Sequence, residues 1–451
     1  MTELVRICQR IKDAGGQAFL VGGAVRDMVL GLEPKDLDVE VFGLSAKSLE
    51  DILNTFGKVD AVGRAFGILK LTTETEDFDF SLPRRDNKVG QGHKGFILEV
   101  DKDMSIEEAA SRRDFTMNSV SFEPIEEKLI DFWFGLEDLD DRLLVATSEH
   151  FSEDALRVLR GMQFAARFEM KMHQKTAIAC HQMLDEFRFL SQERVWEEWK
   201  KWALKGKKPS MGLEVLDDVG WLFHFPEIEE LIDLPQTPFW HPEGDVWEHT
   251  CQAVDFAVTL CDREGIENSD RLVMVFAALC HDMGKPATTE ILSDKIITHG
   301  HDKAGEAPIR SFMARIGAPA WLVERVVPLV TNHMVRRRGL QTRRAVRRLA
   351  DRLAPASIQE LMWLVEIDGS SRHPAPPFVS WSIDIILNLA EQEKCKEGAV
   401  ESILMGRHLI EIGMKPGPAF GRILAEAREA QLDGEFSDLE GAKKWLTQST
   451  N

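Results

Sequence analysis

No tyrosine occurs among the 451 residues, although phenylalanine (25) and tryptophan (11) are well represented, and nothing in the composition explains this. The six cysteines are scattered and form no C-x-x-C pair. Their spacing excludes a cysteine-based zinc framework and is typical of reduced thiols in the cytoplasm. The longest apolar run, residues 272–280, is far too short to cross a membrane. We therefore expect a cytoplasmic protein with no membrane segment, whose first 16 residues form an amphipathic helix and not a signal peptide.

Positive charge is also scarce, since the formal net charge is −20. A generic nucleic-acid coat protein would be basic, so that class is excluded, whereas RNA binding on a local basic face is not. The contents of hydrophobic (44%) and charged (29%) residues are those of a soluble globular protein. The length predicts two to four domains.

Strand-like apolar runs are confined to the first third of the chain. They lie at residues 17–21, 37–42, 67–72, 78–82 and 128–132. After about residue 148 helical periodicity dominates, which predicts an α+β part followed by an all-α remainder. The expected linkers are residues 206–209, 235–242 and 374–377.

Two carboxylates follow a glycine turn near the N-terminus. Residues 19–27 (FLVGGAVRD) indicate an apolar strand, a turn and the start of a helix, and Asp36 and Asp38 lie on a second expected strand. Side chains alternate along a strand, so both carboxylates point the same way and repel unless a cation lies between them. Mg²⁺ is a natural candidate, while the paired glycines and Arg26 suit a phosphate. This pattern predicts a metal-dependent nucleotidyl-transfer site, with a surface turn as the simpler alternative.

Other groups could complete this site. Asp79 lies on another expected strand and is either a third metal-binding carboxylate or a solvent-facing residue. The glycine-rich stretch 86–95 is expected to be a mobile loop that closes over a substrate or is simply solvated. In residues 111–119 (SRRDFTMNS), two arginines before an aspartate suit a triphosphate and a ribose hydroxyl, although an exposed helix start has the same composition.

Residues 153–167 (EDALRVLRGMQFAAR) indicate a helix with a charged face. Asp154, Arg157 and Arg160 are spaced by three and share that face, where a surface ion pair is the simpler interpretation. The alternative is base recognition, in which a carboxylate accepts from an exocyclic amine and a guanidinium donates to a ring acceptor. Cytosine and adenine present that pattern, and guanine and uracil present the reverse. Asp154 and Arg157 are therefore predicted to accept CTP and ATP and to reject GTP and UTP.

The order of these motifs resembles that of class II tRNA nucleotidyltransferases, the bacterial CCA-adding enzymes and their poly(A) polymerase relatives in the polymerase-beta-like superfamily. The motifs are GGAVRD (22–27), DLD (36–38), RRDFT (112–116), LID before GLEDL (129–139), EDALR (153–157) and ERV (193–195). The resemblance extends to about residue 230. It implies a nucleotidyltransferase head (1–147), a helical neck and body with the nucleotide-template helix (148–240), a third domain (241–377) and a helical tail (378–451).

The same resemblance implies roles for individual residues. Asp36 and Asp38 would hold two Mg²⁺ ions, one activating the RNA 3′-hydroxyl and one stabilising the leaving pyrophosphate. Contacts with the triphosphate or ribose fall to Gly23, Arg26, Arg113 and Arg160. Asp154 and Arg157 would be the amino-acid template for the incoming base, and Glu193 and Arg194 would stiffen the neck helices. Many relatives carry a nucleotide-contacting arginine where this chain has Gln163, so one contact differs.

A second candidate site lies after residue 242. Its signals are His249, the pair His281-Asp282, the pair His301-Asp302, His333 and Asp368. Histidine and aspartate suit Mn²⁺, Ni²⁺, Fe or Zn²⁺, which activate water. The order resembles that of HD-domain phosphohydrolases, which implies His249, His281, Asp282 and Asp368 as metal ligands, with His301 and His333 for a second metal or a substrate phosphate. An HD fold kept only as a scaffold is the alternative.

Residues 336–348 form the one strongly basic run and either contact the tRNA backbone or are a solvated helix face paired with nearby acids.

The leading hypothesis is an enzyme that adds CCA to tRNA 3′ ends from CTP and ATP. Partial A-adding, CC-adding or poly(A)-adding activities are near alternatives, and Val62-Gly63-Arg64 and the loop after Arg85 favour the full or A-adding tRNA enzyme. Two more distant alternatives are a metal phosphohydrolase of the HD type as the main activity and a non-catalytic RNA-binding protein.

Overall fold

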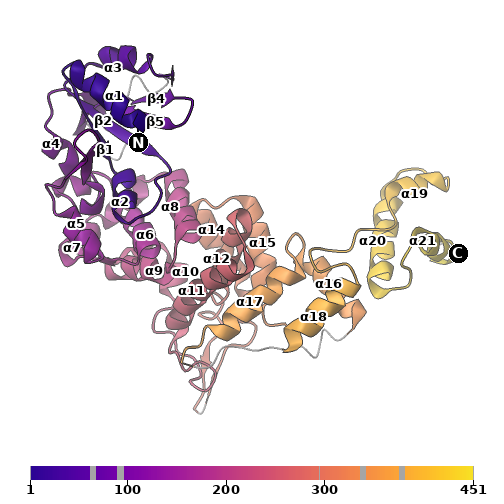
Figure 1. Ribbon diagram of the computed structural model, residues 1–451. Helices are drawn as coiled ribbons and strands as arrows, with labels where there is room; N and C mark the ends of the chain where they lie inside the picture. Colours follow the sequence, from indigo (N-terminus) through magenta and orange to yellow (C-terminus); the bar gives the residue numbers. More distant parts are fainter. Residues whose placement is uncertain are drawn as a thin grey trace. The chain divides into compact units, whose positions relative to one another are not determined.

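The computed structural model describes residues 2–60, 68–88, 96–293, 295–335, 342–374 and 381–449. The chain forms two compact units, residues 1–224 and 225–451, which are considered separately below (Figure 1). The four-part division expected from the sequence is finer and stays a prediction. Residues 62–64, the tip of the glycine-rich loop (89–95) and the start of the basic run (336–341) lie outside the described residues.

The first unit contains a seven-stranded sheet in the order β3-β4-β5-β2-β1-β8-β9. Its strands are β1 (Gln17–Val21), β2 (Leu37–Phe42), β3 (Lys58–Asp60), β4 (Ile68–Thr72), β5 (Asp77–Ser81), β8 (Ser121–Glu123) and β9 (Lys128–Ile130). All neighbours are antiparallel except β2 and β5, which are parallel. A separate antiparallel pair, β6 (Arg84–Lys88) and β7 (Phe96–Val100), follows β5. The start of the stretch expected to be a loop is therefore a strand.

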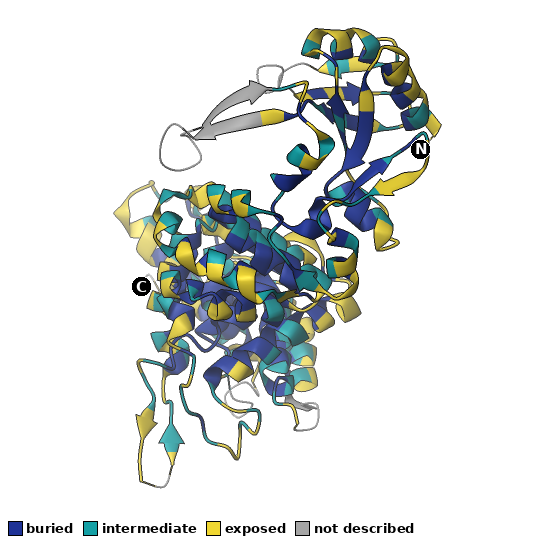
Figure 2. Cartoon of the chain, turned by 90° about the vertical axis from the view of Figure 1, so that its left-hand side faces the viewer, coloured by how far each residue is buried: buried dark blue, intermediate teal, exposed yellow. Residues whose placement is uncertain are grey.

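Alternation along the strands gives the sheet two different faces. Val39 and Val41 of β2 lie in the core with α1 (Thr2–Asp13) and α3 (Ala46–Leu53), where the apolar positions of both helices are buried. Phe80 of β5 lies in the same core. The central strands β1 and β2 are accordingly largely buried, whereas the edge strands β3 and β9 are not (Figure 2). Residues 38, 40 and 79 then fall on the opposite face.

Helices make up most of the remaining first unit. They are α2 (Gly23–Val29), α4 (Ile106–Ser111), α5 (Gly135–Asp140), α6 (Leu156–Phe168), α7 (Gln174–Gln182), α8 (Gln192–Lys205) and α9 (Pro209–Asp218), and the two-residue strands β10 (Leu143–Leu144) and β11 (Lys171–Met172) pair in parallel. α6 packs against both α8 and α9. Trp199 and Trp202 of α8 are fully buried and lie edge to face, with 5.3 Å between ring centroids. The expected α+β fold class is confirmed.

The second unit is almost entirely helical. Its elements are α10 (Pro226–Glu229), α11 (Val246–Glu264), α12 (Asn268–Cys280), β12 (Glu290–Ile291), β13 (Ile296–Ile297), α13 (His301–Ala304), α14 (Glu306–Ile316), α15 (Ala320–Val330), α16 (Arg343–Leu353), α17 (Ile358–Ser370), α18 (Trp381–Gln392), α19 (Gly406–Glu411), α20 (Pro418–Asp433) and α21 (Leu439–Ser449). Helices α11, α12, α15 and α17 pack together and bury an apolar core. Across the described parts of the chain, none of the helices combines the length and apolarity that a membrane crossing requires.

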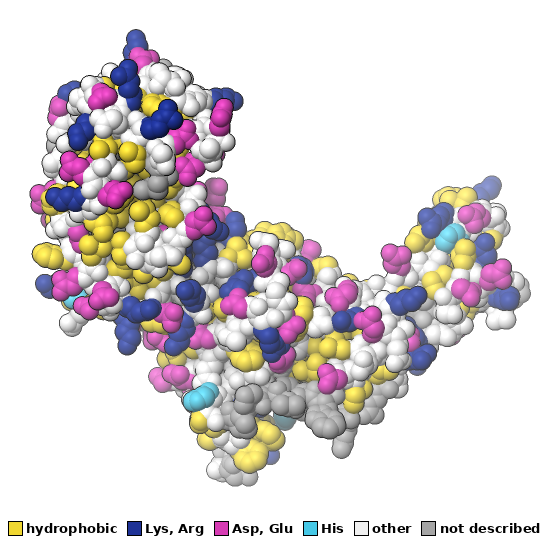
Figure 3. Space-filling view, viewed as in Figure 1, with side chains coloured by type: hydrophobic (Ala, Val, Ile, Leu, Met, Phe, Trp, Pro, Cys, Tyr) yellow, Lys and Arg dark blue, Asp and Glu magenta, His cyan; other side chains and the backbone are white. Residues whose placement is uncertain are grey.

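The described part of the basic run is the helix α16, and its arginines have acidic partners. Arg347 is bonded to Glu393, and Arg348 is 2.7 Å from both Glu429 and Asp433. Basic and acidic side chains are likewise interspersed on the face of the molecule in Figure 3. For these arginines the structure therefore has the paired helix face, which joins α16 to α18 and α20.

Candidate functional site

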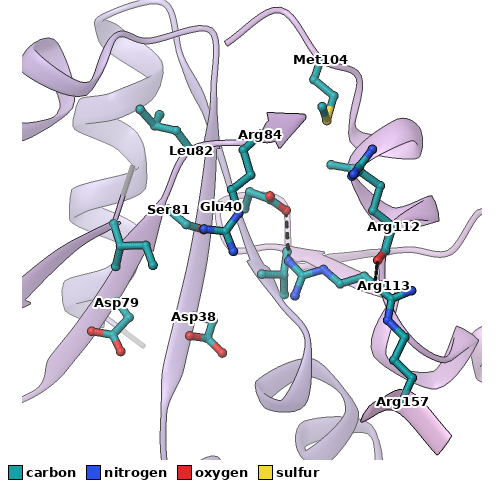
Figure 4. A pocket seen from close by; sticks show the side chains of 13 residues that line it. Asp38, Glu40, Asp79, Ser81, Leu82, Arg84, Met104, Arg112, Arg113 and Arg157 are labelled. Atoms are coloured by element: carbon teal, nitrogen blue, oxygen red, sulfur yellow. Dashed lines mark hydrogen bonds and ion pairs between the residues drawn. The ribbon is translucent and has the colours of Figure 1, made fainter. Parts of the chain in front are cut away.

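Three carboxylates lie on the open face of the sheet in the first unit. Asp38 of β2 and Asp79 of β5 are register partners on parallel neighbouring strands, so their side chains lie side by side (Figure 4). Glu40 follows on the same face and accepts a hydrogen bond from Arg113 Nη2 at 3.1 Å. Asp36 is exposed and lies in a bend just before β2, so it is not on the strand as expected.

The electrostatics of this face favour a bound cation. Burial raises the pKa of the Asp38 carboxyl above its ordinary value. The positive charge of Arg113 opposes this shift, and the negative charges of Asp79, Asp36 and Glu40 add to it. A divalent ion would relieve that repulsion, and a set of oxygen donors only is the kind that Mg²⁺ prefers. The residues present therefore fit the predicted metal.

The glycine turn brings backbone close to Arg113. Gly22, which precedes α2, has a φ of +69°, in the region that favours glycine. A Cβ at this position would lie 3.1 Å from Arg113 Nη1. The turn therefore favours glycine for its conformation, and the missing Cβ also leaves space for the guanidinium.

A cavity of about 460 Å³ collects the nucleotide-binding residues expected from the sequence. Its lining includes Gly23, Arg26, Asp38, Arg113, Asp154, Arg157 and Arg160. A second cavity of about 390 Å³ contains Glu40 and Asp79 (Figure 4). Asp38, Arg113 and Arg157 line both cavities. Segments far apart in the sequence thus meet around one predicted metal-binding carboxylate.

Two of the predicted arginines are held mainly by protein groups. Arg26 is buried, donates to Asp27 and Asn118, and lies 4.5 Å from the ring centroid of Phe168 on α6. Arg157 donates to the carbonyl oxygens of His150 and Arg112, both at 2.7 Å. These contacts hold both guanidinium groups in place, and for both residues nucleotide contact stays a prediction.

The proposed template residue Asp154 is oriented by a second helix. It lies just before α6, and its Oδ1 accepts a hydrogen bond from the backbone N–H of Leu156 at 3.1 Å. Its Oδ2 accepts from Arg194 Nη2 of α8 at 2.6 Å. Sequence reasoning gave Arg194 only a stiffening role, because nothing in the spacing of the two residues indicates this contact.

Two further residues that line the first cavity, Arg160 and Gln163, differ in their hydrogen bonding. Arg160 donates to the buried Asp114 at 2.6 Å, and Asp114 also accepts from Asn118 and from the N–H of Phe115. Gln163 is buried in the cavity lining, and its side-chain nitrogen has no hydrogen-bond partner in the described structure.

The second unit contains a cluster of four buried histidines. The Nδ1 atoms of His281, His301 and His333 each lie 2.7–2.8 Å from a carbonyl oxygen three residues earlier, and His249 Nδ1 lies 2.8 Å from the Ser371 carbonyl. A carbonyl only accepts, so each Nδ1 carries the hydrogen and each Nε2 presents a lone pair. These Nε2 atoms face one another, at 3.2 Å for His249 and His281 and at 3.1 Å for His301 and His333. Converging lone pairs of this kind are typical of a metal site.

Carboxylates complete three groups of potential metal ligands among the described residues, each with donor atoms within 4.8 Å of one another. Two of them lie in this cluster, His249 with His281 and Asp368, and Asp282 with His301 and His333; the third joins His249 to His241 and Glu243. Asp282 lies between the first two groups, with Oδ2 3.2 Å from His281 Nε2 and Oδ1 3.5 Å from His301 Nε2. The four ligands predicted by sequence are therefore brought together, and His301 and His333 form the second group with Asp282.

The loop after α12 is fixed around this cluster. A Cβ on Gly284 would lie 2.0 Å from the His301 carbonyl oxygen, so only glycine allows the two segments to meet. Lys285 is buried, and its ammonium group lies 2.6 Å from Asp282 Oδ2. Burial alone would raise the pKa of the Asp282 carboxyl, but His281 and the positive charge of Lys285 hold it well below its ordinary value.

Two residues next to the cluster, His241 and Glu243, were not predicted from the sequence. Glu243 Oε1 lies 2.7 Å from His249 Nδ1 and 2.8 Å from His241 Nδ1. His241 falls in the expected linker 235–242, and Glu243 follows directly after it. The prolines of this stretch indicated a linker, so no contact with the site was expected. The available signal was the pairing of a histidine with a glutamate six residues before His249.

Comparison with known proteins places this chain. Three family models match: "Poly A polymerase head domain" at residues 18–145, "Probable RNA and SrmB- binding site of polymerase A" at 169–232, and "HD domain" at 246–356. The chain is 33% identical over 393 residues to the multifunctional CCA protein of Tolumonas auensis, covering 83% of this chain and 91% of that protein. The chain belongs to the multifunctional CCA protein family.

Other members and solved structures agree with this assignment. The multifunctional CCA protein of Mannheimia succiniciproducens is 36% identical over 316 residues, which are 68% of this chain and 72% of the relative. The CCA-adding enzyme of Bacillus stearothermophilus, solved with CTP, has a TM-score of 0.64 at 20% identity and covers 100% of this chain and 97% of that one. The Thermotoga maritima enzyme, solved with tRNA, has a TM-score of 0.59 at 17% identity, with coverage of 99% and 94%. The predicted relationship is confirmed, and the CCA-adding enzymes share the fold.

Proposed function

We propose that this chain adds C and A nucleotides from CTP and ATP to the 3′ end of tRNA and so builds or repairs the CCA terminus. The observation that carries the proposal is the shared cavity, which brings Asp38 together with Arg113, Asp154 and Arg157. Membership of the multifunctional CCA protein family supports it. So do the solved structures of similar fold, which contain CTP, ATP or tRNA.

Different residues of the first unit would bind the metal ions, the phosphates and the two substrates. Mg²⁺ bound by Asp36 and Asp38, with Asp79 as a third carboxylate, would lower the pKa of the RNA 3′-hydroxyl and neutralise the leaving pyrophosphate. Arg113 donates to phosphate oxygens, and Gly22 leaves room for its guanidinium. The two cavities that meet at Asp38 provide space for two substrates, an incoming nucleotide beside Asp154 and an RNA 3′ end beside Asp79.

Base selection is assigned to Asp154 and Arg157. Arg194 holds the Asp154 carboxylate, and each oxygen keeps a lone pair for the exocyclic amine of cytosine or adenine. Two backbone carbonyls hold Arg157, so its remaining N–H groups are directed by the protein. A rigid donor and acceptor pair discriminates because a mismatched base leaves buried polar groups unpaired.

Incubation of the protein with tRNA lacking its CCA end tests this proposal. With Mg²⁺, we expect CTP alone to extend the RNA by cytidines, ATP alone to give no extension, and both together to give full-length tRNA. The variant Asp36→Ala should be inactive in all three reactions. Extension by neither nucleotide, with the parent chain and Asp36→Ala indistinguishable, would contradict the proposal.

Partial activities give different products in the same assay. A CC-adding enzyme stops after CTP, an A-adding enzyme extends only tRNA that already ends in CC, and a poly(A)-adding enzyme makes a long tract from ATP. The sequence signals that favour the full or A-adding enzyme lie in residues 62–64 and in the loop after Arg85.

For the second unit we propose a metal-dependent phosphohydrolase centre that binds Ni²⁺ or Mn²⁺ and acts on phosphate esters. Its support is the two ligand groups that meet at Asp282, which favour a pair of metal ions. A bound transition metal would supply a hydroxide at neutral pH. Lys285 places a buried positive charge beside Asp282, where it can bind a phosphate oxygen.

His281→Ala should lower the phosphatase activity that depends on added Ni²⁺ or Mn²⁺ by about 100-fold or more. The reason is that it removes one of the ligands of the group His249, His281 and Asp368. The assay is hydrolysis of a chromogenic phosphate ester with each metal. Addition of CCA by the same variant should be unchanged, which shows that the loss is confined to the second unit. Metal-independent hydrolysis, or full activity of the variant, would show that the histidine cluster is a scaffold.

We also propose a cytoplasmic location. All six cysteines are buried and free of disulfide bonds, which agrees with a reducing compartment.

A further inference from the structure

A completely buried carboxylate lies behind the histidine cluster. The Glu243 side chain has no exposed surface, and its Oε1 is shared by His249 Nδ1 at 2.7 Å and His241 Nδ1 at 2.8 Å. Its other oxygen, Oε2, is buried without a hydrogen-bond partner in the described structure. Burying a carboxylate with one oxygen unsatisfied is costly, and the contacts of the other oxygen with the two histidines offset part of that cost.

Only one of the four clustered histidines has such a partner. The Nδ1 atoms of His281, His301 and His333 each contact the carbonyl oxygen of the residue three positions earlier. His249 Nδ1 lies between the Ser371 carbonyl and Glu243. Its Nε2 reaches the centre of the cluster, 3.3 Å from Asp368 and 3.9 Å from Asp282, where it can contact ligands of both groups.

The chain around Glu243 is held firmly. Asp245, the residue that caps α11, accepts hydrogen bonds from the N–H groups of Glu248 and Asp233. Gln236 donates to the Asp245 carbonyl and also contacts Lys285, which lies beside Asp282. The loop that carries Glu243 is thus attached to the cluster at two places, and these contacts hold the carboxylate in position.

We propose that Glu243 is a positioning residue of the phosphohydrolase centre, where it orients His249 and strengthens Nε2 as a metal ligand. His241 holds the carboxylate from its other side. The physical basis is the carboxylate–histidine–metal arrangement: a negative charge on the Nδ1–H fixes the tautomer, orients the ring and raises the basicity of Nε2. The inference rests on the proposed metal centre and identifies a residue that does not itself touch the metal.

The affinity of the full-length chain for Ni²⁺ and for Mn²⁺, measured by calorimetry with a competing chelator, tests this role. Glu243→Gln keeps the shape and one acceptor but removes the charge, and we expect affinity to fall by about 10- to 100-fold. Glu243→Asp retains the charge and should recover part of that loss. Glu264→Gln, the same change at the exposed far end of α11, should bind as the parent does.

Two further measurements separate the outcomes. The thermal unfolding midpoint without metal and CCA addition by the first unit should be similar for the Glu243 variants and the parent. Unchanged affinity of Glu243→Gln would overturn the inference while leaving the metal centre intact. Equal losses in the Gln and Asp variants, with a lower unfolding midpoint, would make Glu243 a structural staple only. Failure of the parent to bind either metal would remove the proposed centre, and the inference with it.

Discussion

Replacing Asp38 with asparagine should slow nucleotide addition by at least about three orders of magnitude. Asp38 is the one predicted metal-binding carboxylate that lines both cavities of the first unit. The change keeps the size of the side chain but removes the charge that is proposed to bind Mg²⁺ and that balances Arg113. The measurement is the single-turnover rate of CMP incorporation into tRNA lacking its 3′ end, at saturating Mg²⁺ and CTP.

Asp77→Asn is a matched control for this prediction. Asp77 is an exposed residue of β5 in the same sheet, where it lies 3.7 Å from Lys70. It should retain the parent rate, and metal-dependent phosphatase activity in the second unit should persist in both variants. A rate for Asp38→Asn within about tenfold of the parent would contradict the assignment of this face to the metal.

Asp154→Ala should reduce discrimination against UTP and GTP by about 100-fold or more, because the residue is proposed to supply, beside the Arg157 donor, the acceptor of a pattern that cytosine and adenine match. The measurement is kcat/KM for each of the four nucleotides on tRNA that lacks its 3′ end and on tRNA that ends in CC. Rates with CTP and ATP should also fall, since the correct base loses a hydrogen bond.

The contact with Arg194 adds a second test of base selection. Arg194→Ala leaves the Asp154 carboxylate in place but removes the 2.6 Å contact that orients it, so selectivity should fall less than in Asp154→Ala. Asp185→Ala, at an exposed position of the same unit, should leave selectivity unchanged. Unaltered ratios among the four nucleotides in Asp154→Ala would rule out its role as a template.

Local pattern predicted the framework of the first site well. Strands β1 and β2 begin and end where alternation and the glycine turn predict, and the strand register pairs Asp38 with Asp79, the suspected third carboxylate. Both carboxylates were expected on this strand, but Asp36 lies in the bend just before its first residue, Leu37. A periodicity indicates which face a residue occupies, but hydrogen bonding with neighbouring strands decides where the strand starts.

Long-range partners could not be predicted from local patterns. Asp154 was expected to share a helical face with Arg157, yet it precedes α6 and pairs with α8. Arg26 looked like a phosphate ligand, but tertiary packing surrounds its guanidinium with Asp27, Asn118 and Phe168. In each case the partner is selected by how helices pack, which depends on residues far away in the sequence.

In the second unit, too, distinctive residue types were predicted from the sequence, whereas contacts between distant segments were not. The histidines and aspartates of the cluster were recognisable because their types and order are distinctive, whereas Glu243 lay beside an expected linker and had no periodic context. The pairing of α16 arginines with Glu393 and Asp433 likewise depends on helices that come 40 or more residues later.

The central claim is that one chain adds C, C and A, in that order, and then stops. Its most direct test is to incubate tRNA lacking its 3′ end with all four nucleotides and Mg²⁺, and to sequence the products. The account predicts tRNA that ends in CCA, with no uridine or guanosine and no further extension. Products that end in CC, long adenosine tracts, mixed nucleotides or unextended tRNA would each contradict it.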